Sequence, residues 1–157
     1  MNTPGLRTRS AQGWAGPAIF FVLNNRMAKK TVKPGTKQIQ QAQLERFPNR
    51  TKKRRYTIEF TCPEFTCLCP KTGFPDFATI FIRYQPDQWC VELKSLKLYI
   101  NKFRDEGVFH EDVTNIIADD LIGLLDPHQI EVVADFNVRG NIHTVINVTH
   151  SKSSEKV

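Results

Sequence analysis

The sequence lacks any apolar run long enough to cross a membrane as a helix. The stretch that comes nearest, Pro17 to Leu23, has seven residues, whereas a spanning helix needs about 20. The chain also lacks the paired Cys-x-x-Cys motifs that hold structural zinc. A membrane-spanning helix and a zinc-finger domain are therefore both disfavoured.

Cysteine is scarce and poorly placed for disulfides. The four cysteines are Cys62, Cys67, Cys69 and Cys90, and the first three fall within eight positions. Cys67 and Cys69 are too close in sequence for an easy mutual disulfide. This usage is typical of a reducing compartment, so we predict a cytoplasmic location and no disulfide framework.

Positive charge is unevenly distributed along the chain. Lysine and arginine exceed the acids by 22 to 16, and the basic run Lys52–Arg55 contributes much of the excess. At 157 residues the chain suits one domain. We predict a mobile basic extension over residues 1–55, a single domain over 56–150 and a disordered tail over 151–157. The net charge of +6 favours anionic partners.

Hydrophobic periodicity predicts two strands, two helices and two further strands. Alternating apolar residues indicate half-buried strands, and spacing at i, i+3, i+4 and i+7 indicates amphipathic helices. The predicted strands cover 56–62, 77–84, 130–138 and 142–148, and the predicted helices cover 94–106 and 111–125. The apolar run 77–84 is expected to be covered on both faces, and Arg139-Gly140-Asn141 is expected to form a hairpin turn.

The order ββααββ predicts an α+β fold. Its natural packing is a four-stranded antiparallel sheet with both helices on one face. Such a sheet has two open edges, and edges of this kind are usually paired or protected. We therefore expect copies of the chain to assemble edge to edge.

A cysteine and an acid flank a stiff turn between the first two predicted strands. Cys69 precedes the turn Pro70–Pro75, and Asp76 stands immediately after it, seven positions from the cysteine. A thiolate is a strong nucleophile, and a nearby carboxyl can move the proton that the reaction requires. The alternative is a small buried cysteine and an aspartate that ends a turn.

Two lysines stand in the first turn of the helix predicted over 94–106. Lys94 and Lys97 oppose the helix dipole there, which disfavours cations. They suit an anion such as a phosphate, which backbone N–H groups at a helix start also bind. The alternative is a solvated basic face.

His110 and Glu111 open the second predicted helix. The Glu111 carboxylate can accept hydrogen bonds from the two donors of a purine-like amidine edge, and Glu92 can act similarly. His110 can orient a ligand or relay a proton. The alternative for the acids is simple complementarity to the helix dipole.

Three segments together resemble the NADPH-dependent 7-cyano-7-deazaguanine reductases, the nitrile reductases of queuosine biosynthesis in transfer RNA modification. The segments are F-T-C-L-C-P-K-T-G-F-P-D-F-A-T-I, V-E-L-K-S-L-K-L-Y and F-H-E-D. The second matches the family pattern Glu-(Ser/Leu)-Lys-(Ser/Ala)-x-Lys. The resemblance rests on the order and spacing of all three and covers about Tyr56 to Val148.

The resemblance implies the tunnelling fold (T-fold), in which ββααββ subunits pair into a homo-oligomeric ring, rings commonly stack, and active sites lie between subunits. It implies that Cys69 attacks the nitrile to give a covalent thioimidate and that Asp76 donates the proton. Two hydride transfers from NADPH then yield 7-aminomethyl-7-deazaguanine. The substrate-binding positions match Val91, Glu92, Leu93, His110 and Glu111. The cofactor-binding positions match Lys94, Ser95, Lys97 and Arg139, and no metal is implied.

The sequence departs from the family pattern at a few positions. Cys67 stands where many members have serine, Phe74 where glutamine is common, and Val138-Arg139-Gly140-Asn141 replaces a more usual Pro-Arg-Gly-Gly. These changes leave the nucleophile and the acid intact but alter the surroundings of the cofactor.

Other functions remain open from the sequence. An amidinotransferase of the same fold, acting on nitrile-modified transfer RNA, would share Cys69 and Asp76 but would not need Lys94 and Lys97. A pterin-type cyclohydrolase would need metal-ligand spacing that the four histidines do not show. A non-catalytic RNA-binding module would use the basic run Lys52–Arg55, but the aromatic-basic signature of RNA-recognition domains is missing.

Overall fold

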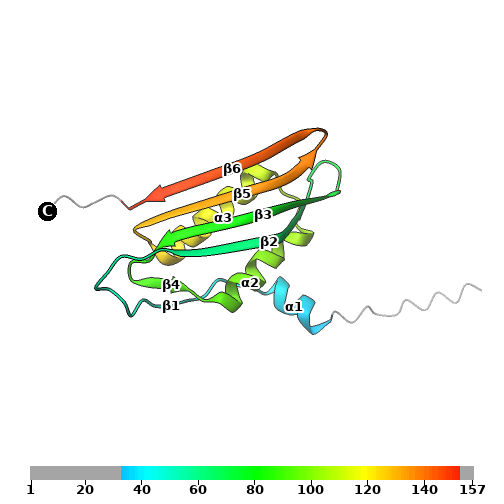
Figure 1. Ribbon diagram of the computed structural model, residues 1–157. Coiled ribbons are helices and arrows are strands. Elements are labelled where there is room, and N and C mark those ends of the chain that lie inside the picture. Colours follow the sequence, from blue (N-terminus) through cyan, green and yellow to red (C-terminus); the bar gives the residue numbers. More distant parts are fainter. Residues whose placement is uncertain (1–32, 153–157) are drawn as a thin grey trace, which may run out of the picture. The chain divides into compact units, whose positions relative to one another are not determined.

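A four-stranded antiparallel sheet forms the centre of the computed structural model, which describes residues 33–152 (Figure 1). The strands are β2 (Ile58–Leu68), β3 (Pro75–Gln85), β5 (Gln129–Arg139) and β6 (Ile142–Ser151). They lie in the order β2-β3-β5-β6, and each neighbouring pair is antiparallel. The sheet predicted from the alternating apolar residues is confirmed.

The turn between β5 and β6 has the chemistry that a two-residue hairpin requires. Gly140 and Asn141 have positive φ angles of 56° and 66°. A type I′ turn needs positive φ at both central residues, and glycine and asparagine tolerate it best. The predicted turn is confirmed, and it fixes the register of Arg139 opposite Ile142.

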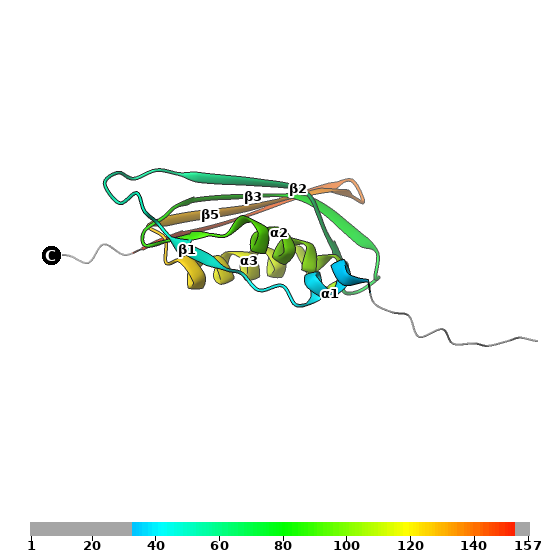
Figure 2. The ribbon, with the colours of Figure 1, turned by 90° about the horizontal axis from the view of Figure 1, so that it is seen from below.

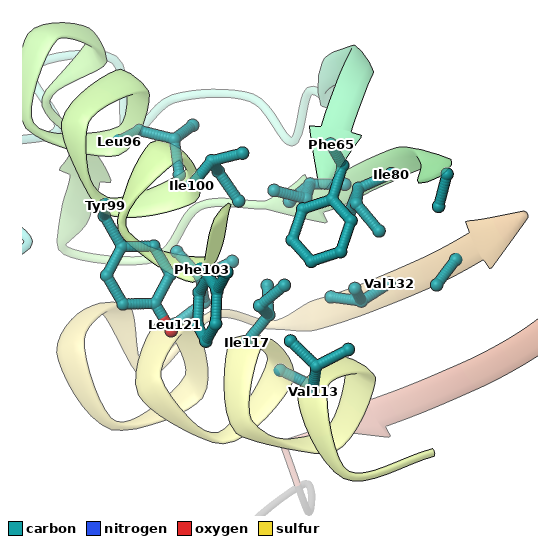
Figure 3. Packing of buried hydrophobic residues seen from close by; sticks show 14 of the residues in the cluster. Phe65, Ile80, Leu96, Tyr99, Ile100, Phe103, Val113, Ile117, Leu121 and Val132 are labelled. Atoms are coloured by element: carbon teal, nitrogen blue, oxygen red, sulfur yellow. The ribbon is translucent and has the colours of Figure 1, made fainter. Parts of the chain in front are cut away.

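Both long helices cover the same face of the sheet (Figure 2). They are α2 (Leu93–Lys102), which continues into the short 3-10 helix η1 (Phe103–Asp105), and α3 (His110–Leu125). Figure 3 shows their apolar side chains meeting those of the sheet, with Leu96, Ile117 and Leu121 packed toward Ile80 and Val132. Burial of this core is the main source of stability. Among the described residues, no helix is long and apolar enough to span a bilayer.

Strand β3 is covered on one face only, so the prediction that its apolar run is buried on both faces is wrong. Ala78, Ile80 and Ile82 alternate with exposed neighbours and face the helices. Phe77 and Phe81 point the other way and are 50% and 41% exposed. Since both helices lie on one side, the described chain has nothing to cover the second face.

A small second sheet extends the folded unit toward the N-terminus. Strand β1 (Arg46–Pro48) pairs with β4 (Trp89–Val91), and helix α1 (Pro34–Gln40) precedes it. The unit therefore begins before Tyr56, the boundary expected from the sequence. A three-residue strand ending in proline has no detectable periodicity, which is why the sequence did not reveal it. Residues 1–32, including Pro17–Leu23, lie outside the described part of the chain.

The C-terminal end of β6 is tied to the loops below it. Ser151 is the last residue of the strand, and the Lys152 ammonium group pairs with the carboxylates of Asp87, at 3.1 Å, and Asp126. The disordered tail was predicted to begin at residue 151, but Ser151 belongs to β6 and Lys152 forms these ion pairs. Residues 153–157 lie outside the described part of the chain.

The two outer strands of the main sheet, β2 and β6, each have one edge without a partner strand in the described chain. Strand β2 is also irregular, with a register shift between Cys62 and Phe65. Unpaired edges expose a row of backbone N–H and C=O groups that another chain can pair with. This geometry agrees with the assembly expected from the strand order.

Candidate functional site

A tight turn after β2 presents Cys69. The Cys69 N–H donates to the Phe74 carbonyl, and the Gly73 N–H donates to the Cys69 carbonyl, both at 2.8 Å. Gly73 has a φ of 71°, a conformation that glycine adopts at little cost. The turn predicted between Pro70 and Pro75 is confirmed, and it closes around the cysteine.

The surroundings of Cys69 favour its thiolate. Hydrogen bonds from the Thr72 hydroxyl and from the backbone N–H groups of Lys71 and Thr72 lower the pKa of Cys69 to about 7, and the Arg139 guanidinium contributes in the same direction. Cys67 differs in every respect. Its side chain is fully buried, and this burial, together with the neighbouring Cys69, raises its pKa to about 11. Cys69 therefore has the lower pKa of the two thiols and the larger thiolate fraction at neutral pH.

Asp76 is a buried acid held by two basic side chains. It lies opposite Cys67 in the β2–β3 register and is 3% exposed. One carboxylate oxygen forms a close ion pair with the Arg139 guanidinium, and the other lies 3.3 Å from His110 Nε2. A buried carboxylate is costly without polar partners, and these two contacts hold the Asp76 side chain in place.

The segment before α3 brings His110 to the same end of the sheet. The Leu68 N–H donates to the Glu106 carbonyl at 2.9 Å, and the Val108 N–H donates back to the Leu68 carbonyl at 3.0 Å. The His110 ring then stacks on Phe136, with centroids 3.7 Å apart and planes 8° from parallel. Burial lowers the pKa of His110, although Glu111 opposes this shift.

Five predicted site residues therefore occupy one end of the sheet. We call them the thiol cluster: Cys69, Asp76, His110, Glu111 and Arg139. Glu111 follows His110 in the first turn of α3 and is exposed to solvent. The cluster combines a thiol of lowered pKa, a buried carboxyl group and an imidazole, which together can form and protonate a covalent adduct.

The remaining predicted site residues gather at the start of α2. We call them the α2 cluster: Val91, Glu92, Leu93, Lys94, Ser95 and Lys97. Glu92 caps the helix, accepting hydrogen bonds from the N–H groups of Lys94 at 2.9 Å and Ser95 at 2.7 Å. These bonds lower the pKa of Glu92.

Members of the α2 cluster differ in how accessible they are. Val91 packs in the core, and the buried Ser95 hydroxyl accepts from the Glu45 N–H and donates to the Glu92 carbonyl. Lys94 and Lys97 are exposed, and neither ammonium group forms an ion pair within residues 33–152. These free cations, near a helix start, fit the phosphate groups of a dinucleotide.

A groove lies beside the α2 cluster, between β2 and α2. It has a volume of about 250 Å³, and Leu93 and Lys97 contribute to its walls together with Arg104. Its floor is apolar and includes Phe60 and Leu96. No member of the thiol cluster lines it.

One chain does not bring the two clusters together. The Val91 N–H donates to the Tyr84 hydroxyl at 3.2 Å, which anchors the α2 cluster near that end of β3. Asp76 lies at the other end, eight residues away on the same strand, which is about 26 Å. Arg139, predicted to join Lys94 and Lys97, lies instead in the thiol cluster.

Sequence reasoning missed three contributors to the thiol cluster. It did not find the hydrogen bond of Thr72 to Cys69, the stacking of Phe136 on His110 or the pairing of Arg139 with Asp76. Thr72 is three residues from Cys69 inside a predicted turn, which is a usable signal. The other two contacts join positions far apart in sequence and carry no local pattern.

A four-stranded antiparallel sheet with both long helices on one face, in the order ββααββ, defines the chain as a T-fold protein. A solved structure of an archaeosine synthase described as QueF-Like, in the apo form, has the same fold. The TM-score is 0.55 over 63% of this chain and 95% of that chain. At 11% sequence identity, the likeness concerns the fold alone.

The chain belongs to the family of QueF-like proteins, whose family model matches residues 75–155. A relative from Thermomicrobium roseum is 58% identical over 113 residues, which is 72% of this chain and 88% of the relative. A relative from Aquifex aeolicus is 57% identical over 122 residues, which is 78% of this chain and 95% of the relative. Both relatives are named NADPH-dependent 7-cyano-7-deazaguanine reductase.

Proposed function

We propose that this protein reduces the nitrile of 7-cyano-7-deazaguanine to 7-aminomethyl-7-deazaguanine with NADPH, as part of queuosine biosynthesis in transfer RNA modification. Relatives that carry this activity in their names are 47–61% identical to the chain. The single observation that carries the chemistry is a cysteine with a pKa of about 7 at the same sheet end as a buried carboxylate. A nitrile carbon is an electrophile that a thiolate can attack, and its nitrogen needs a proton.

In the first step, the Cys69 sulfur forms a bond to the nitrile carbon, and one π bond between that carbon and nitrogen breaks. The product is a thioimidate, a covalent adduct whose carbon is more easily reduced than that of the nitrile. Asp76 takes the proton that the Cys69 thiol loses as it becomes the nucleophile, and passes it to the nitrogen. A covalent intermediate divides a difficult four-electron reduction into smaller steps. Cys67, protonated and buried, takes no part.

The deazaguanine base is gripped by carboxylates at helix starts. Glu111 accepts from the two donors on the amidine edge of the base, and His110 orients the ligand beside Asp76. Val91, Glu92 and Leu93 complete the substrate surface. The Glu92 oxygens each hold one backbone N–H and keep a second acceptor site for the substrate.

NADPH, when bound, supplies hydride for both reductive steps. Lys94 and Lys97 hold its phosphate groups, because both ammonium groups are exposed at the start of a helix. The buried Ser95 hydroxyl stabilises this surface through its hydrogen bonds with the backbone of Glu45 and Glu92. The hydride acceptor, bound to Cys69, and the hydride donor, NADPH, are thereby held by different parts of the chain.

A complete site requires a second copy of the chain. Because the clusters lie at opposite ends of β3, the thiol cluster of one copy meets the α2 cluster of another. The unpaired edges of β2 and β6 provide the pairing surface, and repeated pairing of this kind closes a ring. We place this homo-oligomer in the cytoplasm, where its cysteines stay reduced.

The test mixes the purified protein with 7-cyano-7-deazaguanine and NADPH and follows the reduced-nicotinamide absorbance. We expect about two NADPH consumed per nitrile, because a nitrile takes four electrons to become an amine. Cys69→Ala abolishes the reaction, and Cys67→Ser is the matched control that retains it. Activity in Cys69→Ala together with inactivity in Cys67→Ser would overturn the assignment.

A further inference from the structure

Arg139 does more than complete a cofactor surface. Resting on the proposed nitrile reduction, we propose that Arg139 is a positioning residue that acts through Asp76. It keeps the carboxylate aimed and ionised until the proton of Cys69 reaches it, and it speeds release of that proton to the nitrile nitrogen. The guanidinium contacts one carboxylate oxygen of Asp76 directly.

A local irregularity in β5 aims Arg139 at the acid. Ala78, two residues after Asp76 on the buried face, pairs with Phe136, so a regular strand would place Val138 opposite Asp76. The β5–β6 register shifts between Phe136 and Arg139, and Val138 is instead 63% exposed. A bulge of this kind redirects the following side chain to the other face. The irregularity therefore delivers a guanidinium, where a regular strand would deliver a valine.

The Asp76 side chain is buried, so its ion pair with Arg139 strongly affects the energy of its charged form. The Asp76 side chain is only 4% exposed, whereas the Arg139 side chain is 43% exposed and keeps contact with water. Asp76 therefore depends on Arg139 for its charge far more than Arg139 depends on Asp76. The second carboxylate oxygen faces His110 from α3, next to which Glu111 stands in the sequence. Cys67 lies opposite Asp76 on β2, and Cys69 follows in the turn after that strand. The direct effect of Arg139 on the sulfur is small, because it is the weakest of the causes that shift the pKa of Cys69.

The proton balance explains why an ionised acid is useful. Formation of the thioimidate joins sulfur to carbon, breaks one carbon–nitrogen π bond and moves one proton from the thiol to nitrogen, with no oxidation or reduction. Asp76 accepts that proton from Cys69 and passes it on. A neighbouring guanidinium weakens the hold of the carboxyl on its proton, which favours the transfer to nitrogen. Asp76 is then a carboxylate again and can pair with the Arg139 guanidinium.

Adduct formation without NADPH separates this role from cofactor binding. The wild-type protein and the variants Arg139→Gln and Arg139→Lys are mixed with 7-cyano-7-deazaguanine alone, and the covalent adduct is followed by intact-protein mass spectrometry across pH. We expect Arg139→Gln to slow adduct formation about tenfold or more and to move the acidic limb of the pH profile upward by about one unit. Arg139→Lys keeps the charge and recovers most of the rate.

The matched control is Arg83→Gln, which removes an exposed guanidinium–carboxylate pair with Glu59 elsewhere on the sheet. It leaves the rate and the pH profile of adduct formation unchanged. A wild-type rate and profile in Arg139→Gln without cofactor would overturn the inference and leave the proposed reaction standing. Failure of the wild-type protein to form an adduct or consume NADPH would overturn the reaction itself.

A second comparison keeps the inference testable whatever Arg139→Gln does alone. In an Asp76→Asn background, the amide cannot carry the proton, so adding Arg139→Gln changes the rate of adduct formation by less than about twofold. If the two substitutions instead multiply their separate effects, Arg139 acts independently of Asp76 and the inference fails. Size-exclusion chromatography of each variant checks that assembly is retained.

Discussion

The thiol cluster and the α2 cluster differ in where their charged groups lie and in whether these groups are paired. In the thiol cluster, the Asp76 carboxylate is buried and neutralised by Arg139, and the reactive sulfur is tuned by hydrogen bonds from its own turn. In the α2 cluster, Lys94 and Lys97 stand in water without an ion-pair partner among the described residues. Buried, paired charges suit preorganised chemistry, and exposed cations suit the capture of an anionic ligand from solution, as the proposed function requires. In the proposed function, the first cluster performs the chemistry and the second binds the cofactor.

Mixing two inactive variants gives the sharpest test of this separation. Cys69→Ala disables the thiol cluster, and Lys94→Glu combined with Lys97→Glu disables the α2 cluster. When equal amounts are unfolded and reassembled together, about a quarter of the sites combine two intact clusters from different copies. We expect about a quarter of wild-type NADPH oxidation, measured by absorbance. Activity no higher than the sum of the separate variants would mean that each site uses one chain alone.

Removing single lysines separates binding from chemistry. Lys94→Ala or Lys97→Ala removes a charge-assisted contact to phosphate, so the KM for NADPH rises about tenfold or more while cofactor-free adduct formation keeps its rate. Steady-state kinetics and intact-protein mass spectrometry measure the two quantities. Lys102→Ala, at the other end of α2, is the matched control and changes neither. Slower adduct formation in the lysine variants would mean that the α2 cluster also contributes to the covalent step.

The pH dependence of alkylation tests the tuning of the thiol cluster. Because its pKa is lowered to about 7, Cys69 is mostly thiolate above that pH, and its reaction with iodoacetamide slows about tenfold one unit below it. Cys67, buried and with a raised pKa, stays unmodified in the folded protein. Peptide mapping after short exposures measures both sites. A midpoint for Cys69 near the ordinary thiol value would remove the distinction between the two cysteines.

Ser95 provides the smallest effect and tests how far the α2 cluster touches ligand. Ser95→Ala removes two buried hydrogen bonds, so the free energy of unfolding falls by about 1–3 kcal/mol. The KM for NADPH stays near the wild-type value if the hydroxyl serves only to hold the helix start. Urea denaturation and steady-state kinetics measure the two quantities. A raised KM with unchanged stability would place Ser95 on the ligand surface.

Sequence patterns predicted the main sheet, both long helices and the turn that holds Cys69, because each depends on local periodicity or turn chemistry. They missed β1, whose pairing with β4 joins short segments about 40 positions apart. They also missed the position of Arg139, since a bulge changes which face a side chain takes without leaving a mark in the residue alternation. The one-sided burial of β3 depends on where both helices pack, which is a tertiary property.

The length of strand β3 sets the distance between Asp76 and the anchor of the α2 cluster. Asp76 stands near the first residue of the strand, and Tyr84, which anchors the start of α2 through Val91, stands near its last. Two inserted residues would preserve the alternation of faces, and hence the core, yet lengthen the span by about 6.6 Å. In the homo-oligomer proposed above, the two clusters of neighbouring copies would then no longer meet. Under that proposal, the length of β3 is constrained by the fit between copies as well as by pairing within one sheet.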